Sequence, residues 1–373
     1  MGIYLLSARK LISNVSEDPI FELEDLLVQT CNAHLLMPVA RGVTKLAHQY
    51  PPKVTQWMQK VIRRTGGLHE SIADLALDAA PNVLLIIALN GSWLEMLPSI
   101  PDWRKRFDVV ATYVFDGWLL ETYPRYTKLL DHLFVPMPEI VDELHQHLGI
   151  PVSLLPFGSD VMVHGSYQGD RAIDLISYGR IPAEHNRAFA TAFNHPGSDR
   201  LYFRSTPRRQ ELFPKQPYEL RRDLEDTAQL YQMLRKSRIA LAYDTMYPGM
   251  RVFPHPFVTL RWFQCGGAGC AIAGKRPTTP LADELLDWED STIELPDDPQ
   301  GGVEVITSLL VDPDRLERIR QRNYLENLGR HDWRSRIKDM LQTLEVSLPS
   351  PLAQQLAHLQ ECYAQTLHQF QPF

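Results

Sequence analysis

The sequence predicts an α/β protein built from two Rossmann-like domains followed by a helix at the C-terminus. The chain has 373 residues, which is too long for one ordinary domain. Short apolar runs alternate along it with longer amphipathic stretches, and the same alternation begins again after residue 170. Alternating strands and helices imply parallel sheets that are covered by helices on both faces.

The strands of the first half are expected at short buried runs rich in β-branched and aromatic residues. These runs are Gly2–Ser7, Ala33–Ala40, Val83–Leu89, Val109–Phe115, Leu133–Val135 and Val152–Leu155. Helical patterns between them cover Asp18–Thr30, Lys53–Arg64 and Pro138–His147. We expect this half, residues 1–160, to form the N-terminal domain.

The second half repeats the pattern. Its strands are expected at Ile173–Tyr178, Leu201–Arg204, Ile239–Tyr243, Cys270–Ala273 and Thr292–Leu295, with helices that include Glu219–Lys236 and Asp314–Leu328. The stretch Gly158–Arg171, rich in Gly and Ser, is the expected joint, so residues 161–345 would form the C-terminal domain. In residues 346–373, apolar side chains recur at helical spacing, which predicts a helix that packs back on the body.

Composition limits the classes of protein that fit. With 44% hydrophobic and 22% charged residues the chain is globular, and its net charge of -7 argues against bulk nucleic-acid binding. None of the four cysteines has CxxC spacing, so a reducing compartment fits better than a disulfide framework. There is no signal-peptide pattern, and the longest apolar run, Val83–Leu89, is far too short to span a membrane. We therefore expect a cytoplasmic protein.

Charge is unevenly distributed. Residues 26–69 carry six Lys or Arg and no acid, whereas residues 281–318 carry twelve acids and two Arg. Within residues 41–64, five apolar side chains fall on one helical face, namely Val54, Trp57, Met58, Val61 and Ile62. Such a basic amphipathic helix can lie on anionic lipid, which predicts a peripheral contact at the inner face of the membrane. The alternative is that Trp57 and its neighbours belong to the core while the lysines are solvated.

Several well-known functional motifs are incomplete or absent in this sequence. Gly269–Lys275 matches the start of a phosphate-binding loop, but Arg276 replaces the Ser or Thr that must bind magnesium. Gly266–Gly269 lacks the GxGxxG spacing of a dinucleotide fingerprint. His145 and His147 diverge on a helix, and no HExxH occurs, so no catalytic metal site is expected. GxSxG is absent too, which argues against an α/β-hydrolase.

The most informative stretch is Thr259–Pro277, TLRWFQCGGAGCAIAGKRP. A helix ends in small residues and glycines, and a short buried strand follows. A loop with so little side-chain bulk lets a ligand come close. Plain tight packing of a helix against a strand explains the same glycines.

This stretch resembles the C-terminal domain of group 1 (family 4-like) glycosyltransferases of the GT-B fold. Arg261-Trp262-Phe263-Gln264 is similar to their R-aromatic-F-E segment, Gly269 to the family glycine, and Cys270–Ala273 to the strand that follows. Other pieces occur in the family order, namely LLPFGSD at 154–160, IDLISYGR at 173–180, YQMLRKSRIALAY at 231–243, and His331-Asp332-Trp333 with Arg334 or Arg336. The resemblance covers residues 150–340 and implies two domains that face each other across a cleft.

The resemblance implies a nucleotide-sugar donor as substrate, with no further cofactor. A metal-free site must neutralise the donor diphosphate with Arg or Lys and with helix N-terminal amides. Arg180, at the end of the first strand, is the best placed cation, and a surface ion pair is its alternative role. The expected donor-binding residues are Gly179, Arg180, His255, Arg261, Gln264, Gly266, Gly267, Gly269 and Lys275.

The sequence departs from the family at two positions. Family members commonly carry two glutamates with seven residues between them, and Pro256 and Gln264 stand at these positions in this chain. The second glutamate typically binds the donor ribose. Gln264 can still accept a hydrogen bond from a hydroxyl through its amide oxygen, more weakly than a carboxylate. His255 and the backbone of Phe257–Thr259 are the expected substitutes for the first.

The acceptor is expected on the N-terminal domain, at the carboxyl ends of its strands. Asn90-Gly91-Ser92 follows one strand and Asp116-Gly117-Trp118 the next. Asp116 is the predicted catalytic residue, because it could orient or deprotonate an acceptor hydroxyl. Its alternative role is to cap a helix beginning near Trp118.

These observations predict a metal-independent, retaining glycosyltransferase of the hexosyltransferase type, acting on a glycan, lipid or small molecule. Pro256 and Gln264 keep a non-catalytic nucleotide-sugar or glycan-binding scaffold as the alternative. A third hypothesis is a nucleotide-sugar epimerase on the same fold, which would need no acceptor.

Overall fold

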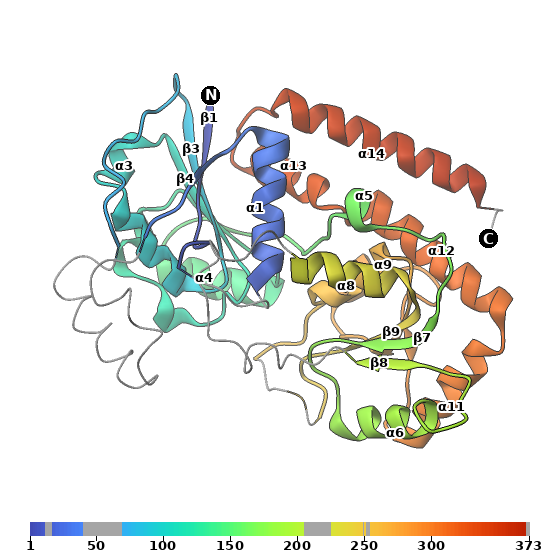
Figure 1. Ribbon diagram of the computed structural model, residues 1–373. Helices are drawn as coiled ribbons and strands as arrows, with labels where there is room; N and C mark the ends of the chain where they lie inside the picture. The colour runs from blue at the N-terminus through green and yellow to red at the C-terminus, as the bar shows by residue number, and fades with distance from the viewer. Residues whose placement is uncertain (12–16, 40–68, 205–224, 249, 251–253, 371–373) are drawn as a thin grey trace. The chain divides into compact units, whose positions relative to one another are not determined.

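The computed structural model describes residues 1–11, 17–39, 69–204, 225–248, 250 and 254–370, which form two compact units (Figure 1). Among the described residues, the first unit holds those within Met1–Pro156 and Ile337–Ala353, together with Glu225. The second holds Phe157–Arg209, Asp226–Arg336 and Gln354–Phe373. The stretch Gly158–Arg171, which the sequence suggested as a joint, therefore lies in the second unit.

The first unit contains a six-stranded parallel sheet in the order β2-β1-β3-β4-β5-β6. Its strands are β1 (Gly2–Leu6), β2 (His34–Leu36), β3 (Asn82–Ala88), β4 (Val109–Val114), β5 (His132–Val135) and β6 (Val152–Leu154). Val83 of β3 is the register partner of both Ile3 and Val109, and every residue of β3 is buried. A continuous run of apolar residues suits this central position, since both faces of a parallel sheet are covered.

Helices and 3₁₀ turns connect these strands. They are α1 (Asp18–Cys31), η3 (Gly91–Ser99), α3 (Trp103–Arg106), η4 (Leu120–Thr122), η5 (Arg125–Leu129), η6 (Pro138–Ile140) and α4 (Val141–Leu148). Helix α1 has a proline in its first turn and ends at Asn32 in the left-handed conformation. The helix expected at Pro138–His147 thus begins as a 3₁₀ turn, η6, and continues as α4.

The second unit contains a five-stranded parallel sheet in the order β11-β10-β9-β7-β8. Its strands are β7 (Ile173–Ser177), β8 (Tyr202–Arg204), β9 (Ser237–Tyr243), β10 (Ala271–Lys275) and β11 (Ile293–Glu294). The α/β class, the two parallel sheets and the C-terminal helix that the sequence predicts are confirmed. Gly274 and Lys275 lie beyond the expected strand Cys270–Ala273 and extend β10, and Gly274 has a φ of 149°.

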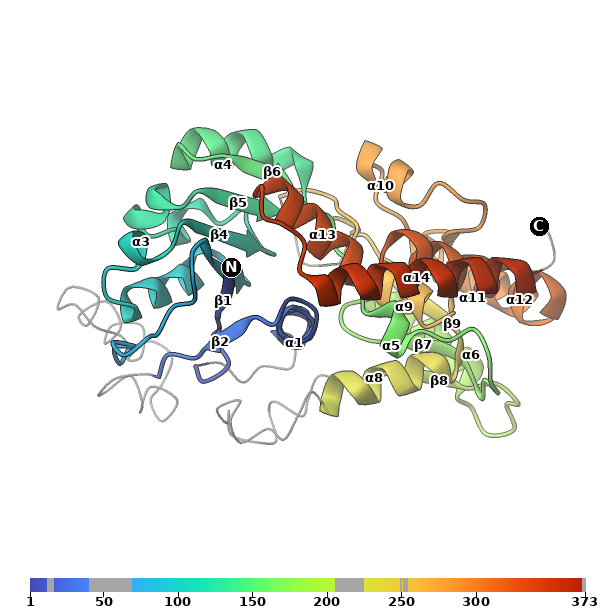
Figure 2. The ribbon, with the colours of Figure 1, turned by 90° about the horizontal axis from the view of Figure 1, so that it is seen from above.

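The helices from residue 161 onward are α5 (Val161–His164), α6 (Ala183–Phe193), α8 (Glu225–Arg235), α9 (Leu260–Gly267), α10 (Pro280–Leu285), α11 (Pro299–Leu310), α12 (Pro313–Arg330), α13 (Trp333–Thr343) and α14 (Ser350–Gln369). Helix α14 runs along α12 in both ribbon views (Figures 1 and 2). Leu359 of α14 packs with Leu328 of α12, and Tyr363 lies where a side chain at Gly329 would stand. The C-terminal helix is therefore closely packed on the second unit.

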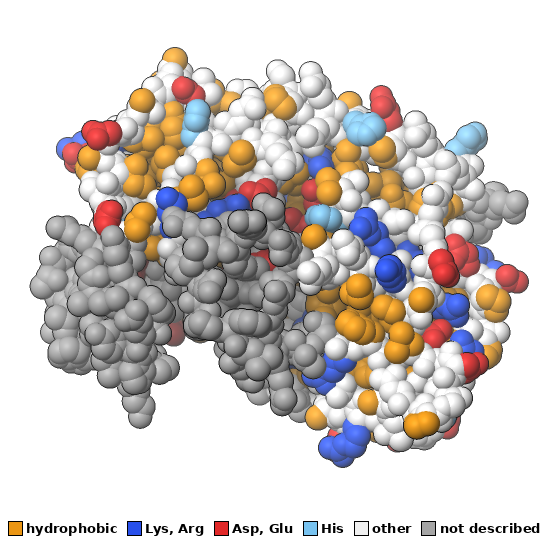
Figure 3. All heavy atoms as spheres, viewed as in Figure 1, with side chains coloured by type: hydrophobic (Ala, Val, Ile, Leu, Met, Phe, Trp, Pro, Cys, Tyr) orange, Lys and Arg blue, Asp and Glu red, His pale blue; other side chains and the backbone are white. Residues whose placement is uncertain are grey.

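The basic segment 41–64, with the expected helix Lys53–Arg64, lies outside the described residues. Across the part of the chain that is described, no helix is both long and apolar enough to cross a membrane. On the face shown in Figure 3, Lys and Arg side chains of the second unit gather around α8, with acidic and hydrophobic side chains beside them. Charges of both signs are thus interspersed on this face.

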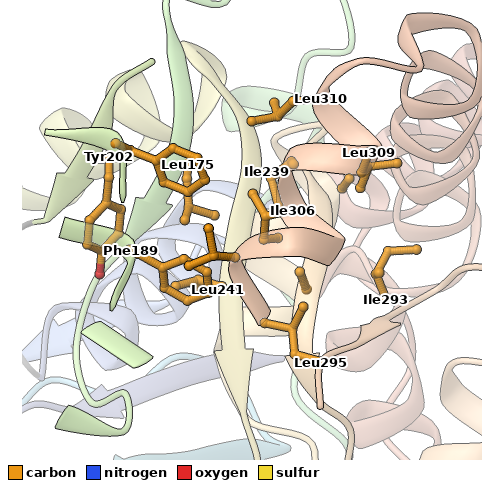
Figure 4. Packing of buried hydrophobic residues seen from close by; sticks show 14 of the residues in the cluster. Leu175, Phe189, Tyr202, Ile239, Leu241, Ile293, Leu295, Ile306, Leu309 and Leu310 are labelled. Carbon is orange, nitrogen blue, oxygen red and sulfur yellow. The ribbon is translucent and has the colours of Figure 1, made fainter. Parts of the chain in front are cut away.

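One face of the second sheet is covered by α6 and α11. Figure 4 shows their side chains, including Phe189 and Ile306, packed against Leu175 of β7 and Ile239 and Leu241 of β9. Alternate residues of each strand enter this core because side chains point to opposite faces in turn. Fully buried residues such as these hold the strands rigidly, so that the loops at their carboxyl ends are precisely positioned.

Candidate functional site

The second sheet has a topological switch point between β7 and β9. From β7 the chain moves to β8 on one side, and then to β9 and β10 on the other. In open parallel sheets such a point creates a crevice outside the carboxyl ends of the two strands, where ligands bind. Tyr178-Gly179-Arg180 follows β7 and Asp244 follows β9, so these four residues lie at the crevice.

Gly179 and Arg261 form the centre of this crevice. Gly179 is exposed and has a φ of 68°, the left-handed conformation that glycine adopts at no steric cost. A side chain there would lie 3.5 Å from the Arg261 guanidinium, which donates a hydrogen bond of 2.8 Å to the carbonyl oxygen of Arg180. Burial lowers the pKa of Arg261, although arginine keeps its proton in proteins. The loop after β7 is thus fixed by a cation from α9, and the Arg180 side chain is exposed beside it.

Gln264 lies one turn along α9 from Arg261 and is only 4% exposed. Its amide oxygen accepts a hydrogen bond of 3.1 Å from the Tyr178 hydroxyl. Burial, together with the neighbouring Cys265, raises the pKa of Tyr178 well above its usual value, so the phenol stays protonated. The oxygen that the sequence reasoning offered to a ligand hydroxyl is therefore engaged by Tyr178.

Asp244 fixes the segment before α9. Burial raises its pKa, while the N–H groups of Met246, Thr245 and Phe257 bond its carboxylate and oppose that rise. Because Phe257 is one of these donors, His255 is brought to the same edge of the sheet. The half-buried His255 ring forms no hydrogen bond or ion pair with the described residues. It is therefore available to a ligand.

Lys275 lies at the end of β10, two strands away from β7. Its ammonium is 3.2 Å from Asp297, whose carboxylate also accepts a hydrogen bond of 3.2 Å from the Tyr247 hydroxyl. These contacts lower the pKa of Asp297. In this arrangement Asp297 compensates the charge of Lys275, so Lys275 is less available to an anion.

The other three glycines of the predicted site pack against protein. Gly266 and Gly267 belong to α9 rather than to a loop. A side chain at Gly266 would lie 2.2 Å from Asn327 of α12, and one at Gly269 would lie 2.4 Å from the carbonyl oxygen of Ser166. At Gly267 it would stand 3.1 Å from Ser159. The packing explanation, which the sequence left open, therefore accounts for the small residues here.

In the first unit, Asp116 follows β4 at the carboxyl edge of the sheet, and its N–H bonds the carbonyl oxygen of Leu89. The helix expected to begin near Trp118 starts at Leu120 as the 3₁₀ turn η4, with Leu119 as its N-cap. The alternative role of Asp116 as a helix cap is therefore wrong. Asn90 does cap η3, because its side-chain oxygen accepts a hydrogen bond of 3.0 Å from the Ser92 N–H.

Among the described residues, no group of three or more His, Cys, Asp or Glu is arranged to hold a metal ion. The cations and N–H groups at the β7–β9 crevice are instead suited to an anion. Helix α6 begins three residues after Arg180, and its N-cap residue, Pro182, makes no side-chain capping hydrogen bond. The N-terminal N–H groups and the dipole of α6 add positive potential to that of Arg180 and Arg261, and the exposed Glu184 in the first turn of the helix offsets part of it.

The structure thus brings Gly179, Arg180, His255, Arg261 and Gln264 to one edge of one sheet. Tyr178 and Asp244, which belong to the same edge, were missed by the sequence reasoning. The signal was present, because each directly follows a buried strand at the switch point. The rule that singled out Asp116 in the first half applies equally to these two residues.

Comparison with known proteins agrees with this description. Residues 199–342 match a family model described as glycosyl transferase-like. No curated protein matches the chain.

Solved structures share the fold. HepE from Anabaena in complex with UDP is 13% identical, with a TM-score of 0.51, and the match covers 92% of this chain and 100% of HepE. The UDP-glucose complex of HepE matches with 13% identity and a TM-score of 0.50, covering 92% of this chain and 99% of HepE. The predicted GT-B fold and the resemblance to group 1 glycosyltransferases are thereby confirmed.

Proposed function

We propose that this protein is a glycosyltransferase that moves a sugar from a nucleotide-sugar donor to an acceptor, with the donor bound at the β7–β9 crevice of the second unit. The observation that carries the proposal is the convergence there of Arg180, Arg261 and the N-terminus of α6. Most of the family-model match falls on this same unit.

Sugar transfer releases a nucleoside diphosphate, on which negative charge develops. Arginine binds phosphate oxygens with paired N–H donors, and helix N-terminal amides add further donors. Charge stabilisation of this kind is commonly the largest contribution to catalysis. We therefore propose a metal-independent reaction. Retention of anomeric configuration is a further proposal, which rests on the resemblance to group 1 enzymes.

The donor that we propose is a uridine nucleotide that carries a hexose. HepE, which shares the fold, was crystallised with UDP and with UDP-glucose. Because fold similarity does not transfer a substrate, UDP-glucose is the first donor to test rather than a conclusion.

On the acceptor side we propose Asp116 of the first unit as the catalytic residue. It lies at the carboxyl end of β4, the edge at which open parallel sheets bind ligands. Its carboxylate would orient or deprotonate the acceptor hydroxyl. The acceptor proposed is a glycan, a lipid or a small molecule that carries such a hydroxyl.

A non-catalytic scaffold that binds nucleotide sugars or glycans is the second proposal. Two observations favour it, namely Pro256 in place of the first family glutamate and the engagement of the Gln264 oxygen by Tyr178. Such a protein would bind the donor through the same cations and would transfer nothing.

Two measurements test these proposals. Thermal shifts are recorded with UDP, GDP, ADP, CMP and their common sugars, with and without EDTA. A ligand at 100 times its dissociation constant adds about 2.7 kcal/mol to the free energy of unfolding. The donor that binds is then incubated with acceptors while nucleoside diphosphate release is followed. We expect a shift that EDTA leaves unchanged and an acceptor-dependent release.

The outcomes separate the two proposals. No shift with any nucleotide would overturn donor binding at the crevice. A clear shift without release for any glycan, lipid or small-molecule acceptor would favour the scaffold.

A further inference from the structure

A hydrogen bond within the protein orients the side-chain amide of Gln264. Its amide oxygen accepts from Tyr178 at 3.1 Å, whereas its amide nitrogen forms no hydrogen bond with the described residues. A glutamine amide carries one acceptor oxygen and two N–H donors. The two N–H donors can therefore bond an acceptor atom of a ligand.

A contact with Cys265 agrees with the amide oxygen of Gln264 facing Tyr178. The Cys265 sulfur lies 3.5 Å from the Tyr178 hydroxyl, and burial raises the pKa of this thiol far above neutrality. The protonated thiol can donate to the phenol oxygen. The phenol proton is then directed to Gln264, which completes a chain from Cys265 through Tyr178 to the amide oxygen.

We propose that Tyr178 is a positioning residue that holds the Gln264 amide with its nitrogen turned to the ligand. The inference rests on the proposed function and specifies its chemistry. At this position the chain recognises an acceptor atom of a nucleoside diphosphate, through a donated hydrogen bond. This is the opposite polarity from a carboxylate, which accepts hydrogen bonds from hydroxyls. Together with Arg180 and Arg261, the crevice then presents N–H donors from three side chains.

The first test needs no ligand. Tyr178→Phe, Gln264→Met and the double variant are compared by denaturant unfolding in a double-mutant cycle. If Tyr178 holds Gln264, each single change lowers the unfolding midpoint, and the double change costs clearly less than the two combined. Strict additivity would show that the two side chains are not coupled, and would overturn the inference.

The second test measures the affinity for UDP by calorimetry. Tyr178→Phe should weaken binding about threefold to tenfold, because the amide is free to turn. Gln264→Glu should weaken it at least about tenfold, because an acceptor replaces a donor and adds negative charge beside the diphosphate. Tyr247→Phe is the matched control, since this hydroxyl at the same edge bonds Asp297 and lies outside the chain of hydrogen bonds. Its affinity should equal that of the wild type.

Unchanged affinity in Tyr178→Phe, or affinity maintained or improved in Gln264→Glu, would overturn the inference and leave the proposed function intact. If the wild type itself binds none of the nucleoside diphosphates, the proposed function is overturned, and the donor role of Gln264 with it.

Discussion

The Arg261 guanidinium donates a hydrogen bond of 2.8 Å to the carbonyl oxygen of Arg180, so that a residue of α9 fixes the loop that follows β7. This contact joins two sequence segments that are 81 residues apart. The two arginines therefore have different roles in this contact. Arg261 positions the loop through its own side chain, whereas Arg180 contributes its carbonyl oxygen to that contact and keeps its side chain exposed.

Replacing Arg261 by lysine should weaken nucleoside-diphosphate binding although the charge is kept. Lysine lacks the planar fork of donors that can bond the Arg180 carbonyl and a phosphate oxygen together. We expect the affinity for nucleoside diphosphate to fall about tenfold. The affinity is measured by calorimetry, with the nucleoside diphosphate that the thermal-shift measurements identify. Affinity equal to the wild type would show that charge alone matters at this position.

Arg180→Ala should weaken the same binding by at least about tenfold, through loss of a charge-assisted contact worth about 1.5–3 kcal/mol. The variant should fold normally, because the backbone carbonyl that Arg261 bonds is unchanged. Arg187→Ala is the matched control, since this exposed arginine on α6 lies beyond the loop. If both variants bind alike, Arg180 is not part of the site.

Gly266→Ala and Gly302→Ala should change stability in opposite directions. At Gly266 the new methyl group would meet Asn327 at 2.2 Å inside the core, and overpacking of this kind costs about 1–3 kcal/mol. At Gly302, inside α11, the nearest atoms are 3.4 Å and more away. Alanine there should stabilise by about 0.5–1 kcal/mol, because the unfolded chain loses freedom. Both values come from denaturant unfolding. An equal loss in the two variants would contradict the packing explanation.

Much of the fold was predictable because its signals are local. Each buried strand of the second unit is an apolar run of a few residues, and β7 and β9 begin or end within two residues of their expected limits. Periodicity also predicts the length of α12 well. The role of the glycines in α9 could not be predicted in this way. Whether Gly266 faces a ligand or Asn327 depends on where α12 packs, which is a long-range fact.

The same distinction holds for the site. Arg180 and Arg261 could be selected by charge and position, but the hydrogen bond between them depends on tertiary structure. Gln264 was expected to accept from a ligand because its chemistry allows it. Only the position of Tyr178, 86 residues away in sequence, shows that its oxygen is already engaged.

His331 should make stability depend on pH. It is buried, its Nε2 bonds the carbonyl oxygen of Leu285 at 2.8 Å, and its Nδ1 lies 3.0 Å from the Arg336 guanidinium. Burial, and then Arg336, hold its pKa down to about 3, against 6.5 in an unfolded chain. Between these values the unfolded state binds more protons, so stability rises with pH through this window and is lost as pH falls.

The measurement is the unfolding free energy of the wild type and of His331→Gln from pH 7 to pH 4. Glutamine keeps a donor for the Leu285 carbonyl but does not titrate. The wild type should lose up to about 3 kcal/mol more than the variant over this range. Parallel profiles would mean that folding does not lower the pKa of His331.

Asp116→Asn should abolish sugar transfer while leaving donor binding intact. The amide keeps the shape of the side chain but is too weak a base to accept a proton from an acceptor hydroxyl, so the rate should fall at least about a hundredfold. The donor residues belong to the second unit, whereas Asp116 belongs to the first, so the affinity for nucleoside diphosphate should be unchanged. Glu121→Gln, an exposed carboxyl group on η4, is the control and should keep full activity. A variant that transfers sugar at the wild-type rate would remove Asp116 from the chemistry and leave the acceptor hydroxyl to another base.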